Sequence, residues 1–273
     1  DSLSNKICLS EIYEEMKISI ITPAYNSAKT IRKTIESIRS QTYKEIEHIV
    51  VDGASSDETV RIASEYKTEN MVILSEPDTG LYDAINKGMS LASGEIVGIL
   101  NSDDFYPTDD VLQTVADAFV DKDIDAVYGD VYYVSQCEPF KKVRFYSSAY
   151  FRPWMMRLGF IPAHPSFYIR KSKAKEVGVY SVKYKIASDF EFLLRCFFKN
   201  KLKTNYIRKV FVYMREGGIS NQGFKSHQVI FMEHRKALKE NDVYSNPLLL
   251  AMRYPVKVYQ LAVFKLKTLF CCI

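Results

Sequence analysis

Short apolar runs alternate with segments of helical periodicity from Lys17 to about Val134. The runs are rich in β-branched residues, which favours strands, whereas the periodic segments place an apolar residue every three or four positions, which favours amphipathic helices. The predicted strands cover 18–22, 47–51, 71–75, 95–100 and 126–134. This alternation is typical of βαβ units, so we expect an α/β fold with a doubly wound, mostly parallel sheet flanked by helices.

Polar residues mark the starts of two of the predicted helices. Ser55 and Glu58 have the spacing of a capping box ahead of the second helix, and we assign Ser55 and Asp57 mainly to capping it. Thr108 is placed to cap the fourth helix. We therefore expect each of these helices to begin directly after its polar residues.

The pattern changes beyond about Tyr146, where aromatic and basic residues become frequent. We expect a strand to start near His164 and a helix to run from about Ser188. A strand is predicted over 206–214, followed by two helical segments. This half reads as a continuation of the same unit rather than as an independent domain.

The composition is that of a globular protein. Of the 273 residues, 47% are apolar and 26% are charged, which excludes a disordered or collagen-like chain. The net charge of +4 is too small to indicate nucleic acid as a partner. The five cysteines are odd in number and lack CxxC spacing, which argues against a disulfide framework and favours a reducing, cytoplasmic location. No apolar stretch reaches the ~18 residues of a membrane span.

Carboxylates follow three of the first four predicted strands. They are Asp52, Asp78 and the adjacent pair Asp103 and Asp104. In a doubly wound sheet, ligands bind outside the carboxyl ends of the strands. Adjacent carboxylates repel each other unless a cation compensates, and Mg²⁺ and Mn²⁺ prefer such oxygen ligands. The pair therefore indicates either a divalent ion that holds a phosphate-bearing ligand or an ordinary loop before Pro107.

Two common phosphate-binding motifs do not occur in the sequence. No strand is followed by GxxxxGK with Ser or Thr, and no GxGxxG is present. Nucleoside triphosphate hydrolysis and dinucleotide redox chemistry are therefore disfavoured. A nucleotide would have to be held by a carboxylate on ribose hydroxyls, an aromatic or polar surface beside the base, and a metal at the phosphates.

Four segments at the ends of the predicted strands carry distinctive motifs. They read ISIITPAYN at 18–26, IVVDGASSDET at 49–59, DTGLYDAINKG at 78–88 and LNSDD at 100–104. In this order and spacing they closely resemble the family 2 glycosyltransferases, which have the GT-A fold. The resemblance is weaker beyond 104, reaches about Ser220, and is greatest to bacterial enzymes that build surface polysaccharides such as O-antigen, colanic acid or capsule.

The resemblance implies a binding site for a nucleotide-diphosphate sugar, linked to UDP, GDP or dTDP. In the family the first loop touches the base and ribose, and these contacts fall on Thr22, Pro23 and Tyr25. Asp52 matches an acid that helps to hold the base. Relatives often carry a second Asp beside it, where this chain has Gly53.

The same resemblance implies where the diphosphate lies. Asp78 and Lys87 belong to the segment under the ribose and diphosphate. The metal-binding DxD motif appears as Asn-Ser-Asp ending at Asp103, so Asp103 is the expected ligand of Mn²⁺ or Mg²⁺ and Ser102 belongs to the donor site. Asp104 would bind either the metal or sugar hydroxyls.

Transfer to a hydroxyl requires removal of its proton, and the resemblance assigns this role of general base to Asp189. Ser188 stands where relatives commonly have Glu. Asp189 at a helix start also suits the helix dipole, which is the alternative interpretation. Glu191, His164 and Trp154 are lesser candidates on the acceptor or donor-sugar side, with structural roles as the alternative for His164 and Trp154.

We divide the chain into four parts. They are a polar N-terminal extension at 1–16, a nucleotide-sugar-binding half at 17–134, an acceptor-facing half of the same domain at 135–222, and a helical, basic and amphipathic C-terminal segment at 223–273. From Leu248 onward, that segment either lies at an anionic membrane surface or packs on the catalytic domain.

The sequence predicts a metal-dependent glycosyltransferase, and inversion at the anomeric carbon is implied by the resemblance alone. The expected acceptor is a hydroxyl of a growing, lipid-linked glycan. The expected location is cytoplasmic, with peripheral attachment to the inner face of the cytoplasmic membrane as an option. Two alternatives stay open, a sugar nucleotidyltransferase and a non-catalytic glycan-binding or assembly protein on the same fold. The first would carry a Gly-rich basic loop after the first strand, which residues 23–27 do not form.

Overall fold

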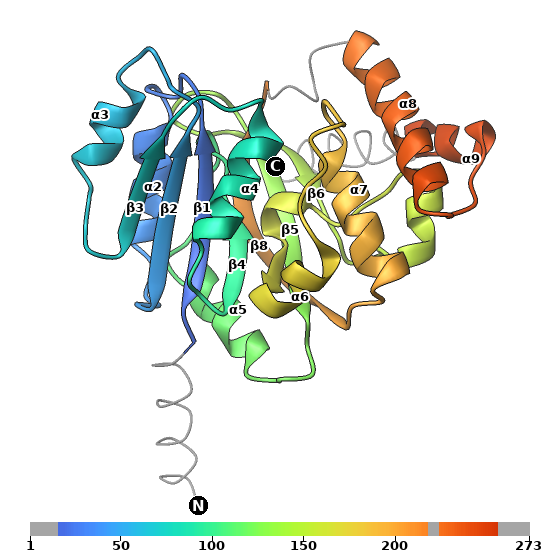
Figure 1. Cartoon of the computed structure of the whole chain (residues 1–273), viewed down its shortest axis with the longest axis horizontal. Helices are drawn as coiled ribbons and strands as arrows, with labels where there is room; N and C mark the ends of the chain where they lie inside the picture. The colour runs from blue at the N-terminus through green and yellow to red at the C-terminus, as the bar shows by residue number, and fades with distance from the viewer. Residues whose placement is uncertain (1–15, 218–223, 256–273) are drawn as a thin grey trace, which may run out of the picture.

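The computed structural model describes residues 16–217 and 224–255, which form one sheet with helices on both faces (Figure 1). Residues 1–15, and the end of the C-terminal segment from 256, lie outside the described residues. Met16 was expected to belong to the N-terminal extension, but its side chain is buried and its carbonyl accepts a hydrogen bond from the Tyr43 hydroxyl. Met16 therefore belongs to the fold.

The first four strands form the parallel half of an eight-stranded sheet. They are β1 (Ile18–Ala24), β2 (Ile46–Asp52), β3 (Met71–Ser75) and β4 (Ile96–Ile99). β1 pairs in parallel with β2 on one side and with β4 on the other, and β3 lies beyond β2. The predicted strand limits are correct to within two residues.

The second half of the sheet is mixed, so the expectation of a mostly parallel sheet holds only for the first half. Its strands are β5 (Ala126–Val134), β6 (Lys142–Tyr146), β7 (Tyr168–Arg170) and β8 (Thr204–Arg215). β7 lies between β4 and β5 and is antiparallel to both. β5 also pairs with β6 in antiparallel and with β8 in parallel fashion. Apolar periodicity reveals strands but not their neighbours, and β7 comes from a later part of the chain.

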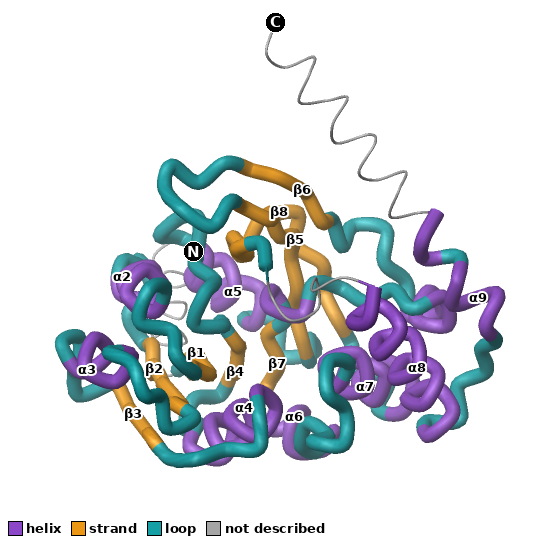
Figure 2. Tube along the Cα trace, turned by 90° about the horizontal axis from the view of Figure 1, so that it is seen from above, coloured by secondary structure: helices purple, strands orange, loops and turns teal. Residues whose placement is uncertain are grey.

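Helices cover both faces of the sheet, with α2 and α5 on one face and α4, α6 and α7 on the other (Figure 2). The alternation along β1 explains this, because Ile20 joins the core cluster of Leu112 in α5 and Ile21 joins that of Ile85 in α4. The helices are α2 (Ile31–Arg39), α3 (Thr59–Ser64), α4 (Leu81–Leu91), α5 (Val111–Phe119), α6 (Lys171–Val177), α7 (Ser188–Leu194), α8 (Phe224–Glu240) and α9 (Pro247–Ala251).

The start of α3 differs from the predicted capping box. Asp57 performs the capping, since its Oδ1 accepts the Thr59 N–H at 3.0 Å. Glu58 does not reach back along the chain but forms an ion pair with Arg61. Of the predicted caps of α3, only Asp57 is confirmed.

At the start of α5, a free backbone N–H group finds its hydrogen-bond acceptor in a distant part of the chain. Thr108 does not cap it, because its hydroxyl donates to the Asp110 carboxylate at 2.6 Å. Instead, Gln41 Oε1 accepts the Leu112 N–H at 3.0 Å. A residue that follows α2 thus supplies the cap, and no local pattern around Thr108 could indicate it.

The described part of the chain contains no helix that is both long and apolar enough to cross a membrane. Cys137 is exposed and Cys196 is buried, and both are free thiols. The other three cysteines of the sequence lie outside the described residues.

Candidate active site

The strands β1, β2 and β4 point their carboxyl ends to one edge of the sheet (Figure 1). β2 lies on one side of β1 and β4 on the other, and such a switch point is where α/β proteins bind ligands. The loops at this edge are joined directly. Ser27 and Ser102 share a hydrogen bond of 2.8 Å, and the Asn26 N–H donates to Ser55 Oγ at 2.8 Å. The loops after β1, β2 and β4 therefore form one connected structure.

The loop after β1 exposes only one of its three predicted site residues. The Thr22 hydroxyl is fully buried and hydrogen-bonded at 3.0 Å to Nε2 of His48, whose pKa burial lowers to about 3. Pro23 is also buried, within β1, whereas the Tyr25 side chain is exposed. Any contact of Thr22 or Pro23 with a nucleotide would thus be made by backbone atoms, and Tyr25 is the side chain available to a ligand.

Asp52 ends β2 and has no exposed surface. Its carboxylate accepts hydrogen bonds from the Ser55 N–H at 2.9 Å, from the Ser55 hydroxyl, and from the Ser75 hydroxyl at 2.8 Å. The assignment of Ser55 to helix capping is wrong, because its hydroxyl donates to the Asp52 carboxylate and its oxygen accepts the Asn26 N–H rather than an N–H of α3. In this arrangement Asp52 ties the loops after β2 and β3 together.

Gly53 makes room for a carboxylate from the next loop. A Cβ at position 53 would collide with Oδ2 of Asp78, while Asp78 Oδ1 accepts the Gly80 N–H at 2.8 Å. The family resemblance leads us to expect a second Asp at position 53. In this structure the Asp78 carboxylate occupies the space beside Gly53.

Lys87 of α4 holds the loop that carries Asp78. Its ammonium forms an ion pair of 2.8 Å with Glu76 and donates to the Pro77 carbonyl at 2.7 Å. Both partners precede Asp78 directly in the chain. The structure thus gives Lys87 a positioning role, and a direct contact with a diphosphate stays a prediction.

We expect Gly53→Ala to weaken the binding of UDP or GDP while changing the melting temperature little, because the new methyl group displaces only the end of the Asp78 side chain. Gly88→Ala is the matched control, since its methyl group would meet Ile21 and Val51 in the core. Overpacking there is expected to cost about 1–3 kcal/mol of stability. Thermal unfolding with and without nucleotide measures both effects. Unchanged nucleotide binding by Gly53→Ala would contradict the role given to Asp78.

Asp103 and Asp104 follow β4 in a loop that is held from both sides. Thr34 of α2 donates its hydroxyl to two carbonyls of this loop, at 3.0 and 2.7 Å. Arg215, the last residue of β8, donates to the Asp103 carbonyl at 2.8 Å, and Asn101 donates its amide to the Asp104 carboxylate at 3.0 Å. The backbone of this loop is therefore held by α2 and β8, and the Asp104 carboxylate is held by Asn101 of the same loop.

The electrostatics of this loop favour a cation. Burial raises the pKa of Asp103 and of Asp104, and the charge of Asp103 raises the pKa of Asp104 further. A divalent ion would relieve this repulsion. Within residues 16–217 and 224–255, no three His, Cys, Asp or Glu side chains lie together as a metal cluster. The pair thus fits an ion that takes its other ligands from water and a bound diphosphate, as Mg²⁺ and Mn²⁺ commonly do.

Asp189 lies in the first turn of α7. Burial raises the pKa of Asp189 to about 6, although its carboxylate accepts the Phe190 N–H at 2.7 Å. The charges of Asp104 and Asp189 both act on Tyr133 of β5. Burial raises the pKa of the Tyr133 hydroxyl, and the negative charges of Asp104 and Asp189 raise this pKa further. The positive charge of Arg144 lowers it. One hydroxyl therefore lies within electrostatic range of both carboxylates.

Glu233 of α8 fixes the segment that leads into α7. Its carboxylate accepts the backbone N–H groups of Lys185 at 2.7 Å, Ile186 at 3.0 Å and Ala187 at 2.9 Å. Its charge also contributes to raising the pKa of Asp189. A glutamate on a helix usually faces solvent, and nothing in the sequence around Glu233 signals this role.

The family model for glycosyl transferase family 2 matches residues 19–185. The chain belongs to glycosyltransferase family 2. A PGL/p-HBAD biosynthesis glycosyltransferase of Mycobacterium tuberculosis is 33% identical to it over 209 residues, which cover 74% of this chain and 78% of that protein. Family membership confirms that the chain is a glycosyltransferase.

Solved structures confirm the GT-A fold of this glycosyltransferase. S. aureus TarS 1–349 has a TM-score of 0.62 and 21% identity, with coverage of 84% of this chain and 67% of that chain. This chain spans 39% of a longer TarS chain. The mannosyltransferase PcManGT from Pyrobaculum calidifontis, solved with GDP-Man and Mn²⁺, has a TM-score of 0.61 and 20% identity, with coverage of 85% and 66%.

Two acceptor-side candidates of the glycosyltransferase have protein partners. His164 Nε2 shares a hydrogen bond of 2.9 Å with the Tyr180 hydroxyl, and burial lowers the pKa of His164 to about 4, so the ring is neutral at physiological pH. Glu191 is buried and both of its carboxylate oxygens bind Arg195, at 2.8 and 2.9 Å. These contacts are structural. Trp154 is exposed, which contradicts the alternative of a core role, and its contact with a sugar stays a prediction.

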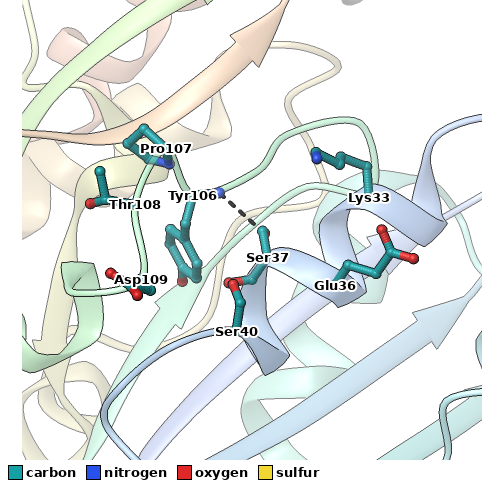
Figure 3. Close-up of a pocket in the computed structure, with 8 residues that line it drawn as sticks. All are labelled: Lys33, Glu36, Ser37, Ser40, Tyr106, Pro107, Thr108 and Asp109. Carbon is teal, nitrogen blue, oxygen red and sulfur yellow. Dashed lines mark hydrogen bonds between the residues drawn. The ribbon is translucent and has the colours of Figure 1, made fainter. Parts of the chain in front are cut away.

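A cavity of about 330 Å³ lies beside the loop of Asp103 and Asp104 but outside the predicted site (Figure 3). Its wall includes Ser37 of α2, whose hydroxyl accepts the Tyr106 N–H at 3.1 Å. It is lined by Lys33, Glu36, Ser37, Ser40, Tyr106, Pro107, Thr108 and Asp109. None of the residues predicted to bind donor or acceptor is among them. The contact across this cavity attaches the segment after Asp104 to α2.

Proposed function

We propose that this glycosyltransferase moves a sugar from a nucleotide-diphosphate sugar to a hydroxyl of a glycan acceptor, with inversion at the anomeric carbon. The observation that carries the proposal is that the charges of Asp104 and Asp189 both act on the Tyr133 hydroxyl. It supports a site in which the Asp103–Asp104 pair would bind a cation and Asp189 would accept a proton. These are the two groups that displacement of a diphosphate by a hydroxyl requires.

Asp189 has the properties of a general base. With its pKa raised to about 6, it is ionised at pH 7 and still basic enough to accept a proton. In the proposed step the acceptor hydroxyl gives its proton to Asp189 while its oxygen bonds to the anomeric carbon. The bond from that carbon to the diphosphate breaks on the opposite side, and the nucleoside diphosphate leaves. A single displacement of this kind inverts the anomeric centre.

The residues on the donor side suit a metal and a diphosphate. Asp103 and Asp104 would hold Mn²⁺ or Mg²⁺, which when bound neutralises the charge of the leaving diphosphate. Arg215 lies beside both carboxylates and adds a fixed positive charge. The structures of PcManGT with GDP-Man and Mn²⁺ and of TarS with UDP-GlcNAc support this arrangement. We infer a donor linked to UDP, GDP or dTDP.

We place the reaction in the synthesis of a bacterial surface glycan, with a lipid-linked acceptor at the inner face of the cytoplasmic membrane. The support comes from the relative in Mycobacterium tuberculosis, which is named for PGL/p-HBAD biosynthesis. The test supplies lipid-linked glycans extracted from bacterial membranes as acceptors, together with UDP-, GDP- and dTDP-sugars and Mn²⁺. We expect release of one nucleoside diphosphate and a product whose NMR coupling shows the inverted anomer. Retention of configuration, or no release with any donor, would contradict the proposal.

The rate of transfer is expected to depend on pH through Asp189. The base must be deprotonated, and with a pKa of about 6 its ionised fraction rises with pH, so kcat should rise about tenfold from pH 5 to pH 7. The measurement is a pH profile at saturating donor and Mn²⁺. A flat profile across this range would show that Asp189 is not the base.

A further inference from the structure

Exposed apolar side chains occur on α9 and on or next to the 3-10 helix Pro153–Leu158, two elements that pack against each other. We call Tyr150, Trp154, Leu248 and Met252 the apolar patch; their side chains are 84%, 58%, 81% and 53% exposed. Leu248 and Met252 are four residues apart and lie on one side of α9. The Ser245 hydroxyl, just before α9, donates to the Arg157 carbonyl of the 3-10 helix at 2.6 Å. The two elements that carry the patch are thus in direct contact.

The parts of the sequence that build the apolar patch have no acidic residues. The chain contains 33 Asp and Glu, yet none occurs in 139–175 or in 243–273. The first segment has nine basic residues and the second has four. They are Lys141, Lys142, Arg144, Arg152, Arg157, Arg170, Lys171, Lys173 and Lys175, followed by Arg253, Lys257, Lys265 and Lys267. Arg152 and Arg157 are exposed on either side of Trp154. Two exposed positive charges therefore flank Trp154, while Arg170 and Arg253 are buried.

The apolar patch lies at the periphery of the described structure, a position that suits a large flat partner. In both views α9 lies at the outer edge of the molecule, beyond α7 and far from β3 at the other end of the sheet (Figures 1 and 2). Exposed apolar groups with basic neighbours are the usual composition of a surface that binds anionic lipid. Tryptophan and tyrosine favour the interface between headgroups and acyl chains.

We propose that the apolar patch docks the protein on an anionic lipid bilayer, with Trp154 and Leu248 among the acyl chains and the basic side chains at the headgroups. The inference deepens the proposed function, because a lipid-linked acceptor places the enzyme at a membrane. The binding itself is measured without any substrate. Its failure and a failure of the catalytic proposal are therefore separate results.

The protein contains a direct probe of this surface, because Trp154 is its only tryptophan. The full chain is mixed with vesicles of phosphatidylcholine, with or without phosphatidylglycerol. We expect the Trp154 emission to shift to shorter wavelength, and to be quenched by brominated acyl chains, only when phosphatidylglycerol is present. Added salt should weaken the binding, because it screens the basic residues. An unshifted emission, or an equal shift with both vesicles, would overturn the proposal.

Variants of exposed residues test the apolar patch itself. Leu248→Asp is expected to lower the partition into phosphatidylglycerol vesicles about tenfold, since it replaces an inserted apolar side chain by a charge. Val182→Asp is the matched control, because Val182 is also exposed but lies between α6 and α7. Melting temperatures show that both variants are folded. Equal partition of Leu248→Asp and wild type would overturn the proposal, as would a lipid-free dimer that Leu248→Asp abolishes, which would assign the patch to a second copy of the chain.

Discussion

Replacing Asp189 by Asn is expected to lower the rate of transfer about a thousandfold, within the range of general-base catalysis. The Asn side chain keeps an oxygen that can accept the Phe190 N–H, so the start of α7 is preserved. Its amide cannot take a proton from the acceptor hydroxyl. Nucleoside diphosphate release measures the loss, and calorimetry with UDP or GDP is expected to show unchanged binding.

The matched control for this variant is Glu176→Gln, which also removes one carboxylate. Glu176 is exposed on α6 and pairs with Lys173 in the same helix. We expect full activity from it. If Asp189→Asn transferred sugar at a rate near that of wild type, Asp189 would not be the general base. If the variant lost nucleotide binding together with activity, Asp189 would contribute to the donor site instead.

Replacing Glu233 by Gln is expected to lower kcat about tenfold or more, although Glu233 is not proposed to touch substrate. The neutral side chain holds fewer of the three backbone N–H groups, so the segment before α7 loosens and Asp189 is less well placed. The pH profile should change as well. The Glu233 charge raises the pKa of Asp189, so its removal moves the acidic limb to lower pH.

The control for Glu233→Gln is Asp242→Asn, which removes the same charge from an exposed position just after α8. Asn tolerates the positive φ of 56° at this residue. We expect no change in kcat or in the pH profile. If Glu233→Gln lowered only the melting temperature and left both kinetic readouts unchanged, the role of Glu233 would be structural alone.

The first half of the fold could be predicted from the sequence because its signals are local. The apolar face of α2 and the β-branched runs of β1 and β2 each occupy a few consecutive residues, and alternating strands and helices form a parallel sheet. The same rule brings Asp52, Asp78 and Asp103 to one edge of the sheet. Strand alternation and family resemblance therefore point to the same loops.

The remainder depends on contacts between distant residues, which periodicity does not reveal. β7 separates β4 from β5 although it follows both in the chain. Asp52 is close to Ser55 in the chain, but its carboxylate also accepts the hydroxyl of Ser75 from the next strand, a contact that no local pattern reveals. Glu233 lies beyond the segment that the family model matches, and only the packing of α8 on α7 brings it to the site. Local propensity was overridden in each case by burial.

Asp103 and Asp104 are proposed to bind a metal together with the diphosphate of the donor. The most direct test is thermal unfolding with UDP, GDP, dTDP or CDP, with and without Mn²⁺, for wild type and Asp103→Ala. Because two carboxylates alone bind the ion weakly, we expect little shift with Mn²⁺ alone. One nucleotide with Mn²⁺ should stabilise the wild type by about 2.7 kcal/mol at a hundredfold excess over Kd, and this gain should vanish in Asp103→Ala. Equal stabilisation of both proteins, or a gain that does not depend on Mn²⁺, would contradict the account.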